Sequence, residues 1–362
     1  MAINFIKNIS NLKFNSLLRY VFPVQFVLGC TGNLLILWVI ECDNFKNRAN
    51  DMLAAVSFAD LLFMVLMLPH SLATFKYLDT SLTYRLLYLP IKQHLAALAN
   101  WMSAAAIWFI LAVSVERFLV IRSPLRSRKY WKKTTKYSLI ISIFVITGVL
   151  TSYHHCAYDC EIFFTCNGKQ LFQACYPAAE ENHPVSWMNG NIIHTSALKR
   201  HLIRISTLGN AIMIVFIPIV LVVILNVLLI RQLHINDQTA LLCSETKLHR
   251  NKYRVTITVI AIGFCLSLTQ GPSAVIVLWE LIGGFTNKSA KFVTIFSITN
   301  SLVVCGKMTN FLLFCVFSTH FRRKFITLIW RKFFNVSLQQ RIFSGIHKAA
   351  MTTDIRLLHD YP

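Results

Sequence analysis

Long apolar runs alternate with short polar segments along most of this chain. About 20 mostly apolar residues are needed for an α-helix to cross a bilayer. Seven stretches reach or approach this length, the fourth being the shortest: residues 20–42, 52–75, 95–121, 137–153, 208–230, 255–282 and 292–317. No internal repeat or low-complexity linker separates them. The pattern predicts an all-α membrane protein with a single seven-transmembrane helix bundle at residues 20–318.

A shorter amphipathic segment follows the last apolar run. Apolar and basic residues share it at helical spacing, beginning with Phe321, Arg322, Arg323, Lys324 and Phe325. A helix of this kind lies along a membrane surface and does not cross it. We therefore predict an amphipathic membrane-surface helix at residues 319–335, followed by a cytoplasmic tail at residues 336–362. Residues 1–19 precede the bundle and carry no signal-peptide pattern.

The composition supports membrane residence and gives the bundle an orientation. Charged residues make up 14% of the chain, whereas a soluble domain carries about a quarter. Lysine and arginine are concentrated after the third, fifth and seventh apolar runs, which favours a cytoplasmic location for these segments. The N-terminus is then extracellular and the protein a multi-pass protein of the plasma membrane, although Lys7, Lys13 and Arg19 favour the opposite orientation.

The net charge of +21 does not predict binding to nucleic acid. No basic run is interleaved with stacking aromatic residues on a soluble domain. Basic loops of membrane proteins instead face anionic lipid. We therefore expect membrane lipid, and not nucleic acid, as the partner of these charges.

The predicted outer segments carry candidate modification sites. Asn8 and Asn287 begin N-glycosylation sequons on this side, while a third sequon, at Asn335, falls inside. Four cysteines gather between the fourth and fifth apolar runs and are disulfide candidates in an oxidising compartment: Cys156, Cys160, Cys166 and Cys175. Zinc binding is an alternative that the lack of matching histidine spacing disfavours. We expect no metal and no cofactor.

An ionisable pair, Glu116-Arg117, closes the third apolar run. A charge at the bilayer centre costs at least about 2.5–3.5 kcal/mol and is usually retained for a function, although an arginine at a helix end can also reach the lipid headgroups. The remaining motifs follow in order along the chain: Gly32-Asn33, Ser57-Phe58-Ala59-Asp60-Leu61, Pro69, Pro124, Pro218, Pro272, Asn310 and Phe321-Arg322. In this joint order, over residues 32–332, the chain resembles rhodopsin-like (class A) G-protein-coupled receptors.

The resemblance implies a receptor that activates a heterotrimeric G protein. It implies that Glu116 holds Arg117 in the resting state, and that Arg117 faces the G protein once the sixth helix swings outward. Phe118, Asn310 and Phe314 stand at further positions connected with activation. Arrestin is a further partner if the tail is phosphorylated, with Ser344, Thr352 and Thr353 as candidate sites.

Several positions depart from the pattern of this family. The third run has no cysteine at its outer end, which excludes the family's disulfide to that helix and leaves three pairings within the loop. The fourth run lacks the family's tryptophan, the sixth reads Thr269-Gln270-Gly271-Pro272, and the seventh reads Asn310-Phe311-Leu312-Leu313-Phe314. These departures affect the expected switching mechanism and not the bundle itself.

One departure predicts a specific contact. Family members often hold a sodium ion beside the aspartate of the second helix. The corresponding positions here are Asp60, Ala106, Gly306 and Lys307, so a hydroxyl is lost and an ammonium is gained. We expect Lys307 to pair with Asp60, near Asn33, and to replace the ion. The alternative is that Lys307 points to water or to a carbonyl.

The narrower resemblance concerns the ligand. Ser114, Phe118 and the motifs of the sixth and seventh runs are closest to invertebrate FMRFamide-like and myosuppressin-like neuropeptide receptors, which implies a short amidated peptide, often ending in Arg-Phe-amide. Such a ligand needs a carboxylate for its guanidinium and aromatic or apolar walls for its ring. The carboxylate candidates are Glu280 first, then Asp159, Glu161, Glu180 and Glu181. The wall candidates are His70, His94, Trp101, Gln270 and Trp279, with ordinary packing or solvation as the alternative role of each.

Two other function classes stay open. A chemosensory receptor of the same fold would respond to external small molecules. A transporter or channel is disfavoured because the chain has no inverted repeat and no pair of Gly/Pro-interrupted helices. An enzyme is not expected, since the chain has no glycine-rich phosphate loop, no His-Glu-x-x-His motif and no nucleophile elbow.

Overall fold

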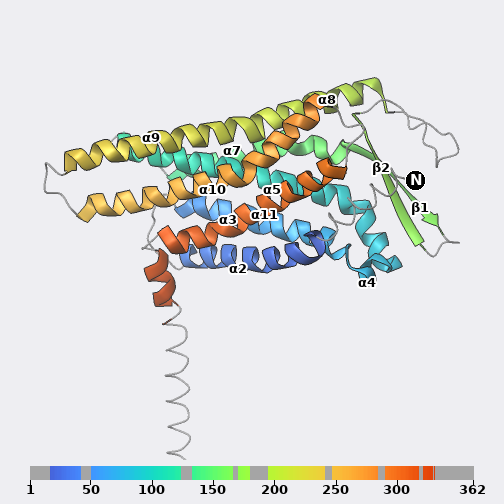
Figure 1. The fold of residues 1–362 in the computed structure, drawn as a ribbon, viewed down its shortest axis with the longest axis horizontal. Helices are drawn as coiled ribbons and strands as arrows, with labels where there is room; N and C mark the ends of the chain where they lie inside the picture. Colours follow the sequence, from blue (N-terminus) through green and yellow to red (C-terminus); the bar gives the residue numbers. More distant parts are fainter. Residues whose placement is uncertain are drawn as a thin grey trace, which may run out of the picture.

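The computed structural model describes residues 17–41, 50–123, 133–165, 170–179, 195–240, 247–283, 290–317, 321–328 and 330. The long helices lie side by side in one bundle, with a two-stranded hairpin at one end (Figure 1). In chain order the elements are η1 (Leu17–Val21), α2 (Phe22–Glu41), α3 (Asn50–Leu72), α4 (Lys76–Asp79), α5 (Leu82–Arg122), α7 (Lys133–Thr151), η2 (Ser152–Cys156), β1 (Tyr158–Thr165), β2 (Gln170–Pro177), α8 (Ala197–Asn210), η3 (Ala211–Phe216), α9 (Ile217–Ala240), α10 (Lys247–Gly283) and α11 (Ala290–Phe317). Residues 321–328 add a short helix at the other end of the bundle (Figure 1).

Six of the described helical segments are long and apolar enough to cross a membrane: Leu18–Glu41, Asp51–Leu72, Leu82–Arg122, Thr134–Cys156, Ala197–Ile235 and Thr256–Ile276. α11 is not one of these six. Its 28 residues nevertheless have sufficient length to cross a bilayer. Apolar side chains on the outside of the bundle are exposed, as at Ile141, Val145 and Val149 of α7. An apolar surface of this extent fits contact with lipid better than contact with water.

The third long helix is longer than the sequence predicts. α5 starts at Leu82 and not near residue 95, and Ser81 caps it by accepting a hydrogen bond from Tyr84 N at 3.4 Å. The added segment contains Arg85 and Lys92, so a search for apolar runs leaves it out. The helix nevertheless continues, and it carries these basic side chains to the hairpin end of the bundle.

The fifth predicted span, residues 208–230, is the middle of a longer rod made of α8, η3 and α9. η3 is a π-helical segment that ends at Phe216, two residues before Pro218. Proline lacks an amide N–H and its ring clashes with the carbonyl four residues earlier. A wider turn at this point accommodates the proline without ending the helix.

The β1–β2 hairpin corrects the expectation of an all-helical protein. The two strands pair antiparallel, with Cys160 opposite Cys175, and both contact α5. Each strand has eight residues, too short to register as a membrane span. The hydrophobic pattern therefore leaves this segment as a loop, whereas the pairing of its two halves makes it a sheet.

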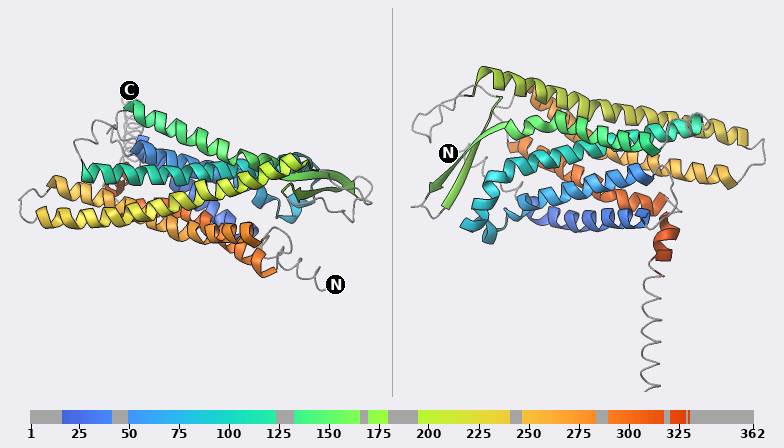
Figure 2. Two further views of the ribbon diagram at one scale, coloured as in Figure 1. Left: turned by 90° about the horizontal axis from the view of Figure 1, so that it is seen from above. Right: turned by 180° about the vertical axis from the view of Figure 1, so that it is seen from behind.

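α5 runs through the middle of the bundle and contacts α3, α7, α9 and α10 (Figure 2). The largest group of buried apolar side chains surrounds it, including Phe109 and Val113. Phe321, from the short helix at residues 321–328, is part of the same core and stacks on Phe325 at 6.0 Å between ring centroids. Part of the apolar face that we expected on the lipid surface therefore packs against the bundle.

Candidate functional site

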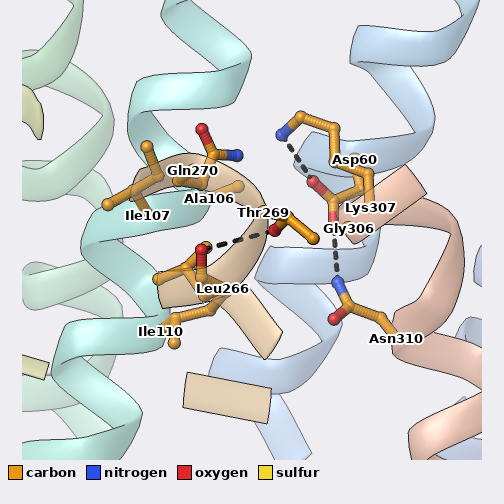
Figure 3. A pocket seen from close by; sticks show the side chains of 10 residues that line it. All are labelled: Asp60, Ala106, Ile107, Ile110, Leu266, Thr269, Gln270, Gly306, Lys307 and Asn310. Atoms are coloured by element: carbon orange, nitrogen blue, oxygen red, sulfur yellow. Dashed lines mark hydrogen bonds and ion pairs between the residues drawn. The ribbon is translucent and has the colours of Figure 1, made fainter. Parts of the chain in front are cut away.

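A buried polar cluster lies in the middle of the bundle, where α3, α5, α10 and α11 meet (Figure 3). Lys307 Nζ lies 2.9 Å from Asp60 Oδ1, and Asn310 Nδ2 donates a hydrogen bond to Asp60 Oδ2 at 2.7 Å. Asp60 is 1% exposed and Lys307 is 4% exposed. Lys307 and Asn310 are three residues apart and so share one face of α11. Each oxygen of the buried carboxylate thus receives its own donor from the same helix.

Two further residues lie beside Lys307, one at its ammonium and one at its backbone. Lys307 Nζ lies 4.6 Å from the centroid of the Phe63 ring, within the range of a cation–π contact. Asn33 donates to Gly29 O at 2.9 Å and reaches Lys307 O at 3.5 Å, so it contacts the α11 backbone and not the charge. The buried charge is therefore balanced by a carboxylate and by an aromatic face.

The four positions compared with a sodium site line one small cavity of about 10 Å³, together with Thr269 and Gln270. Ala106 and Gly306 supply no side-chain oxygen, and both oxygens of Asp60 are already engaged. A cavity of this size holds about one water molecule at most. The residues present do not fit a bound sodium ion.

Gly306 allows α10 and α11 to approach each other at this point. A Cβ atom added to Gly306 would lie 2.9 Å from the Cβ of Thr269. The hydroxyl of Thr269 is turned back onto its own helix, where it donates to Cys265 O at 2.8 Å. The close approach keeps the central cavity small.

Glu116 and Arg117 lie near the C-terminal end of α5, and we call this end of the bundle the Arg117 end. Glu116 is buried and Arg117 is partly buried. Among the described residues no ion pair joins the two side chains, and both Glu116 Oε2 and Arg117 Nε lack a hydrogen-bond partner. Consecutive residues of a helix do not face each other. The resting-state role of Glu116 in holding Arg117 therefore stays a prediction, and no direct contact between their charged groups supports it among the described residues.

The other three residues predicted to take part in activation do not lie together in one site. Phe118 lies beneath the guanidinium of Arg122, at 5.7 Å from the ring centroid. Asn310 points to Asp60 and belongs to the central cluster. Phe314 lies on α11, with its side chain outside the described residues.

The hairpin carries a disulfide between Cys160 and Cys175. Cys156 is a free, exposed thiol, so its assignment as a disulfide candidate is wrong. Cys166 lies outside the described residues, as do the sequons at Asn8 and Asn287. In the part of the chain that the structure describes, no group of three or more His, Cys, Asp or Glu side chains is placed to hold a metal.

A second cavity, of about 870 Å³, opens at the hairpin end of the bundle, and we call it the hairpin-end cavity. This volume is in the range of small-molecule and cofactor pockets. η1, the end of α3, the start of α5 and β2 all contribute to its wall. The polar and aromatic side chains that line it include Arg19, His70, Asp79, Tyr84, Arg85 and Lys92.

The predicted ligand-wall residues do not converge on one pocket. His70 lines the hairpin-end cavity, whereas Gln270 lines the small central one. Trp101 packs against α7, where its Nε1 donates to Phe144 O at 2.9 Å. Trp279 is 67% exposed on α10.

His94 has a different partner from the one expected. Its Nδ1 lies 2.9 Å from Nδ1 of His155, which links α5 to η2 at the start of the hairpin. Two rings at this distance share one proton, so the pair acts as a polar contact between these elements. His94 is exposed, and the pair lies beside the hairpin.

The candidate carboxylates are also separated. Asp159 accepts a hydrogen bond from Thr195 at 2.8 Å and pairs with Lys199, so its charge is already compensated. Glu161 is exposed on β1. The side chain of Glu280, and Glu180 and Glu181 as a whole, lie outside the described residues.

Sequence reasoning missed most of the hairpin-end cavity. Arg19 enters the sequence-based predictions only through topology, and no role is predicted for Tyr84, Tyr88 or Lys92. The usable signal was their spacing: Tyr84, Tyr88 and Lys92 are four residues apart and share one face once α5 starts at Leu82.

Comparison with known proteins assigns this arrangement to a receptor family. Residues 26–332 match the model of the serpentine type seven-transmembrane G-protein-coupled chemoreceptor family Srw. The chain is 34% identical over 320 residues to the putative G-protein coupled receptor F59B2.13 of Caenorhabditis elegans, covering 86% of this chain and 72% of that protein.

Two more distant relatives are similar over comparable lengths. Galanin receptor 2a of Danio rerio is 23% identical over 357 residues, covering 94% of this chain and 84% of that receptor. The probable G-protein coupled receptor B0563.6 of Caenorhabditis elegans is 23% identical over 321 residues, covering 85% and 68%. The assignment extends over nearly all of the described bundle.

Proposed function

Because the chain belongs to the Srw family of seven-transmembrane G-protein-coupled chemoreceptors, and is a receptor and not an enzyme, we propose that an extracellular ligand bound in the hairpin-end cavity activates a heterotrimeric G protein at the Arg117 end. The observation that carries this proposal is the separation of two sites at opposite ends of one helix. α5 contributes Tyr84, Arg85 and Lys92 to the cavity and, at its other end, Arg117. A helix of this length can couple a change at one end to the other.

The proposed orientation puts the hairpin outside the cell and the Arg117 end in the cytoplasm of a plasma-membrane receptor. The Cys160–Cys175 disulfide favours an oxidising compartment for the hairpin. The short helix at residues 321–328 carries Arg322, Arg323 and Lys324 at the opposite end, as cytoplasmic segments usually do. Lipid headgroups and the G protein are the proposed partners of this basic surface, and arrestin is a further one.

A peptide is the proposed ligand class. The distant similarity to a galanin receptor supports it. Glu161 and Glu280 remain the proposed carboxylates for an Arg-Phe-amide ending, because Asp159 is engaged by Lys199. The alternative is a small-molecule chemosensory receptor, which the description of the family as chemoreceptors favours.

We further propose that Lys307 permanently takes the place of a bound cation beside Asp60. The Lys307–Asp60 contact at 2.9 Å and the second donor from Asn310 support this role. A receptor built this way switches without the entry or loss of an ion at its centre.

The test is expression of the full chain in cells that report G-protein dissociation, with amidated peptides and small molecules as two panels. We expect a response to at least one panel that is lost in Arg117→Gln at unchanged surface expression. Arg122→Gln is the matched control, since Arg122 is a neighbouring arginine stacked on Phe118. An undiminished response in Arg117→Gln would refute the coupling role, and ligand-driven current without G protein would favour a channel.

A further inference from the structure

The hairpin-end cavity is rich in positive charge. Arg19, Arg85 and Lys92 line it, and among the described residues Asp79 is the single carboxylate on its wall. Asp79 is not free, because its Oδ1 lies 2.7 Å from Arg85 Nη2. The acid and one of the bases therefore neutralise each other before any ligand arrives.

Arg85 is committed to holding the cavity wall together. Its Nη1 donates to Leu171 O of β2 at 2.6 Å, and its Nε donates to the backbone carbonyl of Asp79. All three guanidinium nitrogens thus have protein partners. Arg85 fixes the hairpin to α4 and α5 and has little capacity left for a ligand.

Two basic side chains remain. Lys92 is exposed on the cavity wall, and no carboxylate among the described residues pairs with its ammonium. Arg19 donates to the carbonyl of Thr74 and lies over the Phe75 ring at 5.7 Å, neither of which carries a compensating negative charge. The cavity therefore presents uncompensated positive charge from both η1 and α5.

Unpartnered polar atoms lie around the same cavity. Arg19 Nε, His70 Nδ1 and Gln173 Oε1 are buried and have no hydrogen-bond partner, and all three residues line this wall. A buried polar atom without a partner costs free energy, so native structures rarely leave several of them together. A bound molecule that accepts a hydrogen bond from Arg19 Nε and donates one, for example from an amide N–H, to Gln173 Oε1 would satisfy these two atoms.

The remaining wall is aromatic. Tyr84 and Tyr88 are stacked at 5.4 Å between ring centroids, and the Tyr84 hydroxyl donates to Pro69 O at 2.6 Å. The hydroxyl of Tyr84 is therefore occupied, and the ring face is what it offers to the cavity. Such a ring face can pack against the aromatic or apolar part of a ligand whose ionic group binds the basic side chains nearby.

From these observations we infer that the hairpin-end cavity recognises a carboxylate attached to an aromatic or apolar body, with Lys92 and Arg19 as its charge partners. The inference rests on the proposed function in that the carboxylate belongs to the extracellular ligand. The cavity then disfavours a guanidinium, which would meet two like charges. An Arg-Phe-amide peptide would have to keep its arginine outside this cavity.

The experiment compares an acid with its uncharged amide on the full-length protein in lipid nanodiscs. The probes are N-acetylphenylalanine and N-acetylphenylalanine amide, and the readout is thermal stabilisation as a function of probe concentration. We expect the acid to bind at least about tenfold more tightly than the amide, the effect of one charge-assisted contact. Lys92→Gln and Arg19→Gln should each reduce this preference, whereas Lys76→Gln, an exposed lysine of α4 outside the cavity, should retain it.

Equal binding of acid and amide overturns the inference, as does binding of neither probe or an unchanged preference in Lys92→Gln. If Lys92→Gln does not fold, Lys92→Arg keeps the charge and must keep the preference.

A Gly-Gly-Gly-Gly-Phe peptide with a free C-terminus identifies the source of the acid: tighter binding than N-acetylphenylalanine indicates a peptide, and equal binding indicates a small acid. The readout needs no G protein, so acid-selective binding without G-protein activation would refute the proposed function and leave this inference standing.

Discussion

The central cluster around Asp60 and the hairpin-end cavity are both polar, but they differ in size and in how their charges are compensated. In the central cluster, one ammonium and one amide satisfy both oxygens of a buried carboxylate, and the cavity beside them is about 10 Å³. At the hairpin end, a cavity of about 870 Å³ carries basic side chains without acidic partners. A filled and neutral site holds helices together, whereas an open and charged one is suited to recruiting a ligand.

The largest expected effect comes from unbalancing the central cluster. Lys307→Met leaves Asp60 buried without its cation, which should cost about 3–5 kcal/mol of unfolding free energy. The double variant Asp60→Asn with Lys307→Met removes both charges and should recover most of that loss. Thermal unfolding of the nanodisc-embedded protein measures both, and Lys76→Met serves as the exposed-lysine control. A double variant as unstable as the single one would show that the pair does not act as a charge-balanced unit.

A smaller loss is expected at the hairpin. The Cys160–Cys175 bond closes a loop with a sequence separation of 15, for which the chain-entropy model gives about 3 kcal/mol. Cys160→Ser and Cys175→Ser should each lower the stability of the hairpin equally, measured as protease sensitivity of residues 158–177. Cys156→Ser should change nothing, because that thiol is free. Equal sensitivity in all three variants would contradict the assigned pairing.

Filling the space at Gly306 should have a moderate effect. A Cβ there collides with Thr269 of α10, and overpacking of this kind costs about 1–3 kcal/mol. Gly209→Ala in α8 is the matched control, because no described atom beyond its chain neighbours and its own helix backbone lies within 4 Å of the added Cβ, and alanine favours the helix by about 1 kcal/mol. The melting temperatures should therefore move in opposite directions. If Gly306→Ala is as stable as the parent, the approach of α10 and α11 is looser than described.

The smallest expected effect is that of sodium. Because Lys307 and Asn310 occupy both oxygens of Asp60, replacing sodium chloride by choline chloride at constant ionic strength should leave ligand affinity and thermal stability unchanged. Radioligand binding or thermal unfolding in the two salts tests this. A sodium-dependent shift would mean that the ammonium leaves Asp60 in a populated state.

Part of this structure could be predicted from the local pattern of the sequence and from its few charges within apolar runs. The apolar runs locate the helices because a helix that crosses a bilayer needs apolar side chains over the thickness of the hydrocarbon core. Asp60 and Lys307 could be matched because two charges inside one bundle are costly unless they meet. The start of α5 and the β1–β2 hairpin could not be predicted this way, since residues 82–94 and 158–177 owe their structure to capping and strand pairing.

The sequence by itself determined that the chain crosses a membrane several times, which residue types its interior carries, and which charges need partners. Only the tertiary structure decided which partners they find. Trp101 donates a hydrogen bond to α7, Asp159 pairs with Lys199, and Cys160 forms a disulfide with Cys175. Such contacts between distant segments depend on how the elements pack and not on the local pattern. The hairpin-end cavity exists for the same reason: η1, α3, α5 and β2 each contribute a few side chains, and no one segment contains the site.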